Sequence, residues 1–134
     1  MGTSAESLGG VVDLFCGAGG FSWGWKQSGF ELMAAIDCES AALRSHELNF
    51  GDSCGATLRR DLSTYSASTF KQEAKGFRSK NLTAIIGGPP CQAYTLVGRA
   101  RNKGIVGYEP AQDHRHFLYK EYIRIIGKLQ PAAF

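Results

Sequence analysis

The residue of this 134-residue sequence that is best placed for chemistry is Cys91, which follows two prolines in the run Gly-Gly-Pro-Pro-Cys. Each proline fixes its own φ angle and lacks an amide donor, so the backbone that leads into Cys91 is stiff. A free cysteine is usually an inert buried thiol, which is the role we expect for Cys16, Cys38 and Cys54. The proline pair, together with the basic segment that follows, favours a nucleophile at Cys91.

Two other kinds of cysteine chemistry are less favoured. His114 and His116 could supply a base for a cysteine protease or acyltransferase, but no pattern places either ring beside Cys91, and this alternative stays open. No two of the four cysteines form a Cys-x-x-Cys pair, so we expect no metal site. The first ten residues do not resemble a secretory signal, and we therefore expect reduced thiols.

A second candidate site is the glycine-rich segment at residues 15–20, Phe-Cys-Gly-Ala-Gly-Gly. Glycines let a backbone pass close to a ligand, and a following helix offers free amide donors and the positive end of its dipole. Asp37 lies twenty residues after Gly17, where a carboxylate can accept hydrogen bonds from ribose hydroxyls.

The spacing within this segment bears on the ligand. A dinucleotide fingerprint would place glycine or alanine at position 22, which is serine here. The segment therefore favours a nucleoside ligand without a pyrophosphate, S-adenosylmethionine, over a nicotinamide dinucleotide. The simpler alternative is a tight turn of glycines beside a surface aspartate.

The elements that must position these residues alternate between strand and helix. Buried strands are predicted at residues 11–15, 32–36 and 82–86, a short strand near residues 57–58, and the start of another at 132–134. Helices are predicted at 21–28, where Gly29 ends the helix, and at 40–49, 66–76 and 114–129. The helix at 40–49 is expected to bury Ala41, Leu43 (or Ala42) and Leu48, and the last helix Phe117, Leu118, Tyr122, Ile125 and Ile126.

This alternation predicts an α/β fold with a doubly wound, mostly parallel sheet. We expect residues 1–10 to be a flexible tail and residues 11–134 to form one domain. Residues 92–112 lack periodicity and are expected to form a functional or mobile loop. No apolar run is long enough to span a membrane.

The net charge of +3 is unevenly distributed. Residues 1–91 carry eight Lys or Arg and nine Asp or Glu, whereas residues 92–134 carry seven and three. The basic excess thus begins directly after Cys91, as a phosphate-facing surface would require, although a solvated basic face is the commoner cause.

Taken together, these segments resemble the DNA (cytosine-5) methyltransferases. Residues 13–22, Asp-Leu-Phe-Cys-Gly-Ala-Gly-Gly-Phe-Ser, match the cofactor motif of that family, and residues 88–92, Gly-Pro-Pro-Cys-Gln, match its catalytic motif. Residues 113–115, Asp-His-Arg, resemble the Asp-x-Arg segment that opens the next helix. The resemblance implies the amino-terminal part of a Rossmann-like, S-adenosylmethionine-dependent catalytic domain, incomplete at its C-terminal end.

The resemblance also implies roles for single residues. Asp37 would bind the ribose, Cys38 would flank the adenine, and Asp61 would meet the adenine amino group. Without the resemblance, a helix N-cap or a solvated charge is the favoured interpretation of Asp61. The expected cofactor contacts are Phe15, Cys16, Gly17, Ala18, Gly19, Gly20, Asp37, Cys38, Asp61, Leu62 and Pro89. The expected DNA contacts are Gln92, Thr95, Arg99, Arg101, Lys103 and Arg115, of which Thr95 stands where the family usually has serine.

For the reaction, the family implies that the target cytosine is flipped out of double-stranded DNA. The Cys91 thiolate would attack C6, and C5 would take the methyl group. Because a free thiol has a pKa near ~8.5, the site must stabilise the thiolate. Such an enzyme would be cytoplasmic in a bacterium or nuclear in a eukaryote, and not secreted.

The family's Glu-Asn-Val motif, whose glutamate holds cytosine N3, and its target recognition domain do not occur in the sequence. We therefore expect the 134-residue chain not to methylate DNA alone. Two alternatives keep the family: a cytosine-5 methyltransferase of RNA (tRNA), and a non-catalytic half of a split enzyme that binds a complementary chain.

Overall fold

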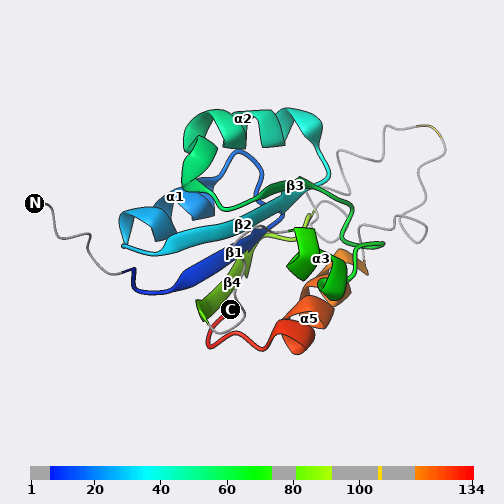
Figure 1. Cartoon of the computed structure of the whole chain (residues 1–134). Helices are drawn as coiled ribbons and strands as arrows, with labels where there is room; N and C mark the ends of the chain where they lie inside the picture. The colour runs from blue at the N-terminus through cyan, green and yellow to red at the C-terminus, as the bar shows by residue number, and fades with distance from the viewer. Residues whose placement is uncertain (1–6, 74–80, 92–105, 107–116) are drawn as a thin grey trace, which may run out of the picture.

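The computed structural model describes residues 7–73, 81–91, 106 and 117–134, and its elements alternate between strand and helix as predicted (Figure 1). In chain order they are β1 (Gly10–Leu14), α1 (Gly20–Gln27), β2 (Glu31–Asp37), α2 (Ser40–Phe50), the short 3-10 helix η1 (Gly51–Ser53), β3 (Thr57–Arg59), α3 (Ala67–Glu73), β4 (Leu82–Gly87) and α5 (Leu118–Leu129).

The four strands form one parallel sheet in the order β3-β2-β1-β4. Ala133 forms a further parallel bridge to Ala84 on the outer edge of β4. Its amide donates to the Thr83 carbonyl (3.0 Å) and its carbonyl accepts from the Ile85 amide (3.1 Å). The parallel sheet and the start of a strand at residues 132–134 are both confirmed.

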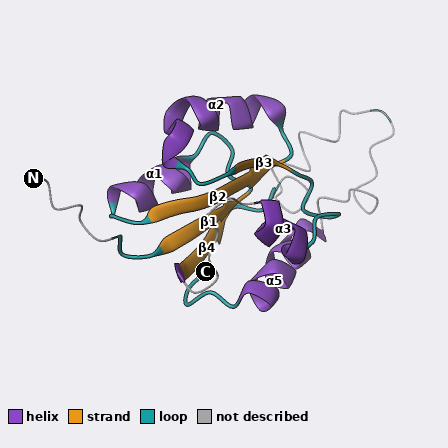
Figure 2. Cartoon of the chain, in the orientation of Figure 1, coloured by secondary structure: helices purple, strands orange, loops and turns teal. Residues whose placement is uncertain are grey.

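Helices cover both faces of the sheet, with α1 and α2 on one face and α3 and α5 on the other (Figure 2). Successive strand residues point to opposite faces, so Val11 packs with Leu43 and Phe50 of α2, whereas Val12 packs with the α5 side. A parallel sheet buried on both faces needs strands that are apolar along most of their length, and β1, β2 and β4 meet this need, although β1 contains the buried Asp13.

Two predicted helix faces were partly wrong. In α2 the buried side chains are Leu43, His46 and Phe50, whereas Ala41 is exposed and Leu48 is 89% exposed. Residues three and four apart share a helix face, and Leu48 is five positions from Leu43. At the start of α5, Phe117 is exposed, while the other expected side chains are buried or half-buried.

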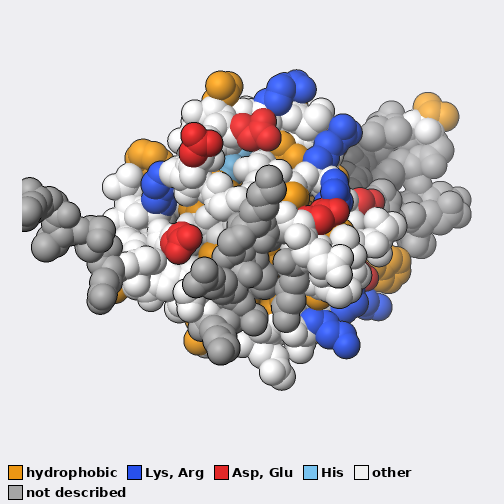
Figure 3. All heavy atoms as spheres, viewed as in Figure 1, with side chains coloured by type: hydrophobic (Ala, Val, Ile, Leu, Met, Phe, Trp, Pro, Cys, Tyr) orange, Lys and Arg blue, Asp and Glu red, His pale blue; other side chains and the backbone are white. Residues whose placement is uncertain are grey.

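Several element ends follow from local chemistry. Gly29 has a φ of 88°, which suits the residue that follows the end of α1. The Oγ of Ser66 accepts a hydrogen bond from the Thr69 amide (3.0 Å) and so caps the start of α3. On the face drawn in Figure 3, acidic and basic side chains are interspersed. In the described parts of the chain, none of the helices has both the length and the apolar composition to cross a membrane.

Candidate cofactor and nucleophile site

The carboxyl ends of the four parallel strands bring the predicted segments to one edge of the sheet. The glycine-rich segment follows β1, Cys38 follows β2, Asp61 lies two residues after β3, and residues 88–91 follow β4. This edge is where doubly wound folds bind ligands.

The glycine-rich segment has three residues in left-handed backbone conformations: Phe15 (φ 62°), Gly17 (φ 55°) and Gly19 (φ 100°). A bulky non-glycine residue such as Phe15 adopts this conformation at an energetic cost, and such residues gather at functional sites. A Cβ on Gly19 would lie 2.2 Å from Cε2 of Phe50, so this position accepts only glycine. Among the described residues other than the immediate chain neighbours and the backbone of the same helix, no heavy atom lies within 4 Å of a Cβ built on Gly17 or Gly20, so these two residues border open space in that part of the structure.

Asp37 holds the glycine-rich segment from the adjacent strand. Its Oδ2 accepts a hydrogen bond from the Gly17 amide (2.9 Å), and its Oδ1 accepts one from the Glu39 amide (2.9 Å). Each carboxylate oxygen can accept a further hydrogen bond. The structure thus places Asp37 beside the glycine-rich segment, as the twenty-residue spacing predicted. Its role as a ribose ligand stays a prediction.

Cys38 is exposed, so the expectation of an inert buried thiol was wrong for this residue. Partial burial, followed by the negative charges of Asp37, Glu39 and Asp61, raises the pKa of the Cys38 thiol. The thiol is therefore neutral at neutral pH and suits contact with an uncharged ring better than catalysis. Cys16 and Cys54 are buried as expected, and burial raises the pKa of each thiol.

Asp61 and Leu62 follow β3. The Oδ1 of Asp61 accepts hydrogen bonds from the amide (2.9 Å) and the hydroxyl (2.7 Å) of Ser63, so Asp61 stabilises a turn and does not cap a helix. The Leu62 side chain is only 3% exposed and belongs to the core. A contact between Leu62 and a cofactor would therefore come from its backbone.

Cys91 is exposed at the end of the segment that leaves β4. A Cβ on Gly87 would lie 2.1 Å from the Leu14 carbonyl oxygen, so the end of β4 packs tightly against the end of β1. The segment that carries Cys91 consequently departs from the sheet beside the glycine-rich segment. The predicted DNA contacts Gln92, Thr95, Arg99, Arg101, Lys103 and Arg115 lie outside the described residues.

The sequence prediction missed a buried polar group beneath the glycine-rich segment. Asp13 and Ser22 form hydrogen bonds with each other, Ser22 contacts His46, and the Asn49 side-chain amide donates to the Ala18 carbonyl (2.9 Å). Two signals in the sequence could have revealed this group. Asp13 interrupts an apolar strand, and His46 lies at helical spacing between Leu43 and Phe50.

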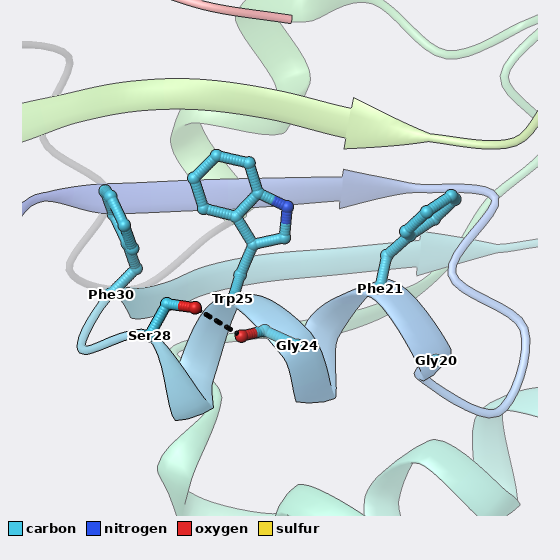
Figure 4. A pocket seen from close by; sticks show the side chains of 6 residues that line it. All are labelled: Gly20, Phe21, Gly24, Trp25, Ser28 and Phe30. Atoms are coloured by element: carbon cyan, nitrogen blue, oxygen red, sulfur yellow. Dashed lines mark hydrogen bonds between the residues drawn. The ribbon is translucent and has the colours of Figure 1, made fainter.

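An apolar pocket of about 370 Å³ lies along α1, between Phe21, Trp25 and Phe30 (Figure 4). Its other lining residues are Gly20, Gly24 and Ser28, so it shares only Gly20 with the expected cofactor contacts. The pocket is therefore a different feature from the site at the strand ends. Within the described residues, no group of three or more His, Cys, Asp or Glu side chains is arranged to hold a metal ion.

The sequence profile of a family described as C-5 cytosine-specific DNA methylase matches residues 10–134. The chain belongs to this family. It is 32% identical over 123 residues to the type II methyltransferase M1.HphI of Haemophilus parahaemolyticus and 32% identical over 123 residues to M.XorII of Xanthomonas oryzae pv. oryzae. Both alignments cover 92% of the chain, but only 30% and 26% of the two relatives, so the chain spans less than a third of their length.

Among solved structures, the chain is similar to one named as a DNA modification methyltransferase encoded within a prophage of E. coli. The TM-score is 0.70 at 31% identity, and the match covers 91% of this chain and 29% of that one. This likeness, the strand order and the family match together identify the fold as the Rossmann-like fold of S-adenosylmethionine-dependent methyltransferases.

Proposed function

We propose that this chain is the cofactor-binding and nucleophile-bearing part of an enzyme that transfers a methyl group from S-adenosylmethionine to C5 of cytosine in DNA. The observation that carries the proposal is the meeting of two segments at one edge of the sheet. The glycine-rich segment leaves β1, and the segment that ends in Cys91 leaves the neighbouring strand β4. Asp37 ends β2, the other neighbour of β1, and accepts a hydrogen bond from the glycine-rich segment.

The cofactor side of the proposal rests on the shape and donors of the glycine-rich segment. Gly17 and Gly20 border open space, which would admit the methionine and adenosine parts of the cofactor against the backbone. Asp37 would accept hydrogen bonds from the ribose hydroxyls, the uncharged Cys38 thiol would flank the adenine, and Asp61 would accept from its amino group. The bound cofactor supplies an electrophilic methyl carbon on a sulfonium sulfur.

In the proposed reaction the Cys91 thiolate attacks C6 of a flipped-out cytosine and forms a carbon–sulfur bond. The electron pair of the C5–C6 double bond then makes C5 nucleophilic, and C5 takes the methyl group as the bond between methyl carbon and sulfonium sulfur breaks, which leaves S-adenosylhomocysteine. Loss of the C5 proton to a base and breaking of the bond between C6 and sulfur restore the ring and free Cys91. The expected DNA contacts in residues 92–115 would hold the phosphates around the flipped nucleotide.

A covalent-trapping experiment tests this mechanism. The chain would be mixed with a complementing polypeptide that carries Glu-Asn-Val and a target recognition domain, with S-adenosylmethionine, and with double-stranded DNA containing 5-fluorocytosine. We expect a protein–DNA adduct on denaturing gels that disappears in Cys91→Ser. The matched control is Cys54→Ser, since Cys54 is a buried free thiol that has no part in the proposed site. An adduct that persists in Cys91→Ser would sink the assignment of the nucleophile.

The same mixture tests two further points. We propose that the 134 residues alone do not methylate DNA and that a complementary polypeptide is needed, so turnover by the purified chain would contradict this. Replacing the DNA by tRNA tests the remaining alternative within the family. Methyl transfer to tRNA but not to DNA would move the substrate to RNA.

A further inference from the structure

A chain of three buried polar side chains runs beneath the glycine-rich segment. Asp13 lies in the central strand, Ser22 in the first turn of α1 and His46 on the inner face of α2, and each is 0% exposed. The Asp13 Oδ2 accepts hydrogen bonds from the Ser22 amide (3.1 Å) and from the Ser22 hydroxyl (2.7 Å). The Ser22 Oγ lies 3.2 Å from the His46 Nε2.

The direction of these hydrogen bonds follows from the donors available. Since Ser22 has one hydroxyl proton and donates it to the carboxylate, the His46 Nε2 must carry a proton and donate to the Ser22 Oγ. Burial lowers the pKa of His46, so its ring is neutral and its Nδ1 carries no proton. The Asp13 carboxylate in β1 is thereby linked, through the Ser22 hydroxyl in α1, to the neutral His46 ring in α2 with its proton on Nε2.

The same face of α2 also touches the glycine-rich segment directly. The Asn49 side-chain amide donates to the Ala18 carbonyl (2.9 Å). A Cβ on Gly19 would lie 3.0 Å from His46 Cδ2 and 2.2 Å from Phe50 Cε2. The His46 and Phe50 rings pack against each other with centroids 4.4 Å apart and planes tilted by 34°. The position of His46 therefore determines where Gly19 and the first turn of α1 can lie.

We propose that Asp13, Ser22 and His46 are positioning residues that hold the glycine-rich segment and the first turn of α1 in the conformation that binds the cofactor; this inference rests on the proposed function. None of the three reaches the open side of the site, so they act through the backbone of residues 17–22. Gly17 is held in turn by Asp37 from the opposite side.

The energetics of the group favour this role over packing alone. Apolar side chains of similar volume would fill the same space without burying polar atoms, and such replacements are often neutral or stabilising. Within the described residues, two of the buried atoms, Asp13 Oδ1 and His46 Nδ1, have no hydrogen-bond partner. These unsatisfied atoms lower the stability of the fold. Retaining the polar group despite this cost is consistent with a need to fix the backbone geometry of the adjacent glycine-rich segment.

Four variants of the chain test the inference. Ser22→Ala removes the central hydroxyl, His46→Leu removes the ring donor, and His46→Gln keeps an amide donor that can reach the place of Nε2. The matched control is Ser28→Ala, because Ser28 lies just after the far end of α1, is exposed and donates its hydroxyl to the Gly24 carbonyl (2.9 Å). Affinity for S-adenosylmethionine and S-adenosylhomocysteine is measured by calorimetry, and the amide signals of residues 17–22 are measured by NMR.

We expect Ser22→Ala to weaken the binding of both ligands by roughly ten- to a hundredfold, as loss of a hydrogen bond to a charged group predicts. His46→Leu, which removes a hydrogen bond between neutral groups, should weaken binding by roughly two- to tenfold. His46→Gln should keep most of the wild-type affinity for both ligands, and Ser28→Ala should bind them as tightly as the wild-type protein does. The amide signals of residues 17–22 should shift in Ser22→Ala and His46→Leu, while those of β2 stay in place.

Two outcomes would overturn the inference. One is unchanged affinity in a folded Ser22→Ala, and the other is a fall in melting temperature with ligand affinity and loop signals intact, which is the pattern of a purely structural role. If the unchanged protein binds neither ligand, the proposed function fails, and the NMR signals alone then decide the positioning role. If His46→Leu does not fold, the comparison of Ser22→Ala with His46→Gln decides.

Discussion

At the scale of single residues, Asp13 is a carboxylate held inside the central strand of the sheet. Burial is the largest cause that raises its pKa to about 6, against lowering by the two hydrogen bonds from Ser22, and the charge of Asp37 adds to the increase. The folded protein therefore holds this proton more tightly than the unfolded chain, whose aspartate pKa is 3.8. By linkage, the contribution of Asp13 to stability falls as pH rises from about 4 to about 6.

Asp13→Asn tests this sign. The amide keeps an oxygen that accepts from Ser22 but carries no charge, so the variant should lack the loss of stability on ionisation, which is on the order of 3 kcal/mol. Urea unfolding at pH 4.5 and pH 7.5 measures it. The free energy of unfolding of the variant, relative to the unchanged protein, should be higher at pH 7.5 than at pH 4.5. His46 is present in both proteins, so its titration cancels; parallel pH profiles would contradict the prediction.

Gly19→Ala is a second prediction at this scale. The substitution places a Cβ at a φ of 100° and 2.2 Å from the Phe50 ring, so we expect a loss of about 2–4 kcal/mol of stability from backbone strain and overpacking together. Gly24→Ala is the control, because a Cβ there meets nothing within 4 Å in the middle of α1. Chemical denaturation should show Gly24→Ala unchanged or slightly more stable. Equal losses in both variants would show that contact with Phe50 is not the cause.

At the scale of elements, α5 ties the segment after β3 to the sheet. The Arg124 guanidinium donates to the Tyr65 carbonyl (2.6 Å) and the Leu62 carbonyl (3.4 Å), while Glu121 holds its Nε (2.6 Å). Two residues before Arg124 in the same helix, the Tyr122 hydroxyl donates to the Ile85 carbonyl of β4 (3.0 Å). The helix thus holds the segment expected to contact adenine and the strand that leads to Cys91.

Arg124→Gln should loosen the first of these two connections. Loss of the hydrogen bonds to the two carbonyls is expected to lower the free energy of unfolding by about 1–3 kcal/mol and to weaken cofactor binding. Lys128→Gln removes a positive charge from an exposed position on the same helix and serves as the control. Thermal unfolding and calorimetry check both effects. If both variants lost the same stability and cofactor affinity, the loss of positive charge would explain the effect, and the hydrogen bonds from Arg124 to the segment after β3 would not.

The elements themselves were largely predictable from the sequence, because apolar runs bounded by glycine mark buried parallel strands. Val11 and Leu82 each fell within a predicted strand that the structure contains. Side-chain roles were harder to predict, because they depend on neighbours distant in sequence. Leu48 looked like a core residue and is exposed, whereas His46 and Asp13 are buried because Ser22 and Phe50 surround them.

At the scale of the whole molecule, ligand binding should raise stability by mass action. A ligand that binds only the folded chain at a hundred times its Kd adds about 2.7 kcal/mol, which raises the melting temperature by several degrees. We expect this shift with S-adenosylmethionine and S-adenosylhomocysteine, none with a nicotinamide dinucleotide, and a smaller one in Asp37→Ala. A shift with the dinucleotide alone would favour an oxidoreductase.

Because β1 pairs with β2 on one side and with β4 on the other, the strands are expected to pair in a definite order during folding. Its partner β2 is separated from it by one short helix, whereas β4 lies about seventy positions further along the chain, a separation that delays pairing. As the chain is synthesised or refolds, β1, α1 and β2 can therefore join first, and with them the glycine-rich segment and Asp37. The strand that leads to Cys91 can pair only afterwards, so we expect the proposed cofactor half of the site to form before Cys91 is placed beside it.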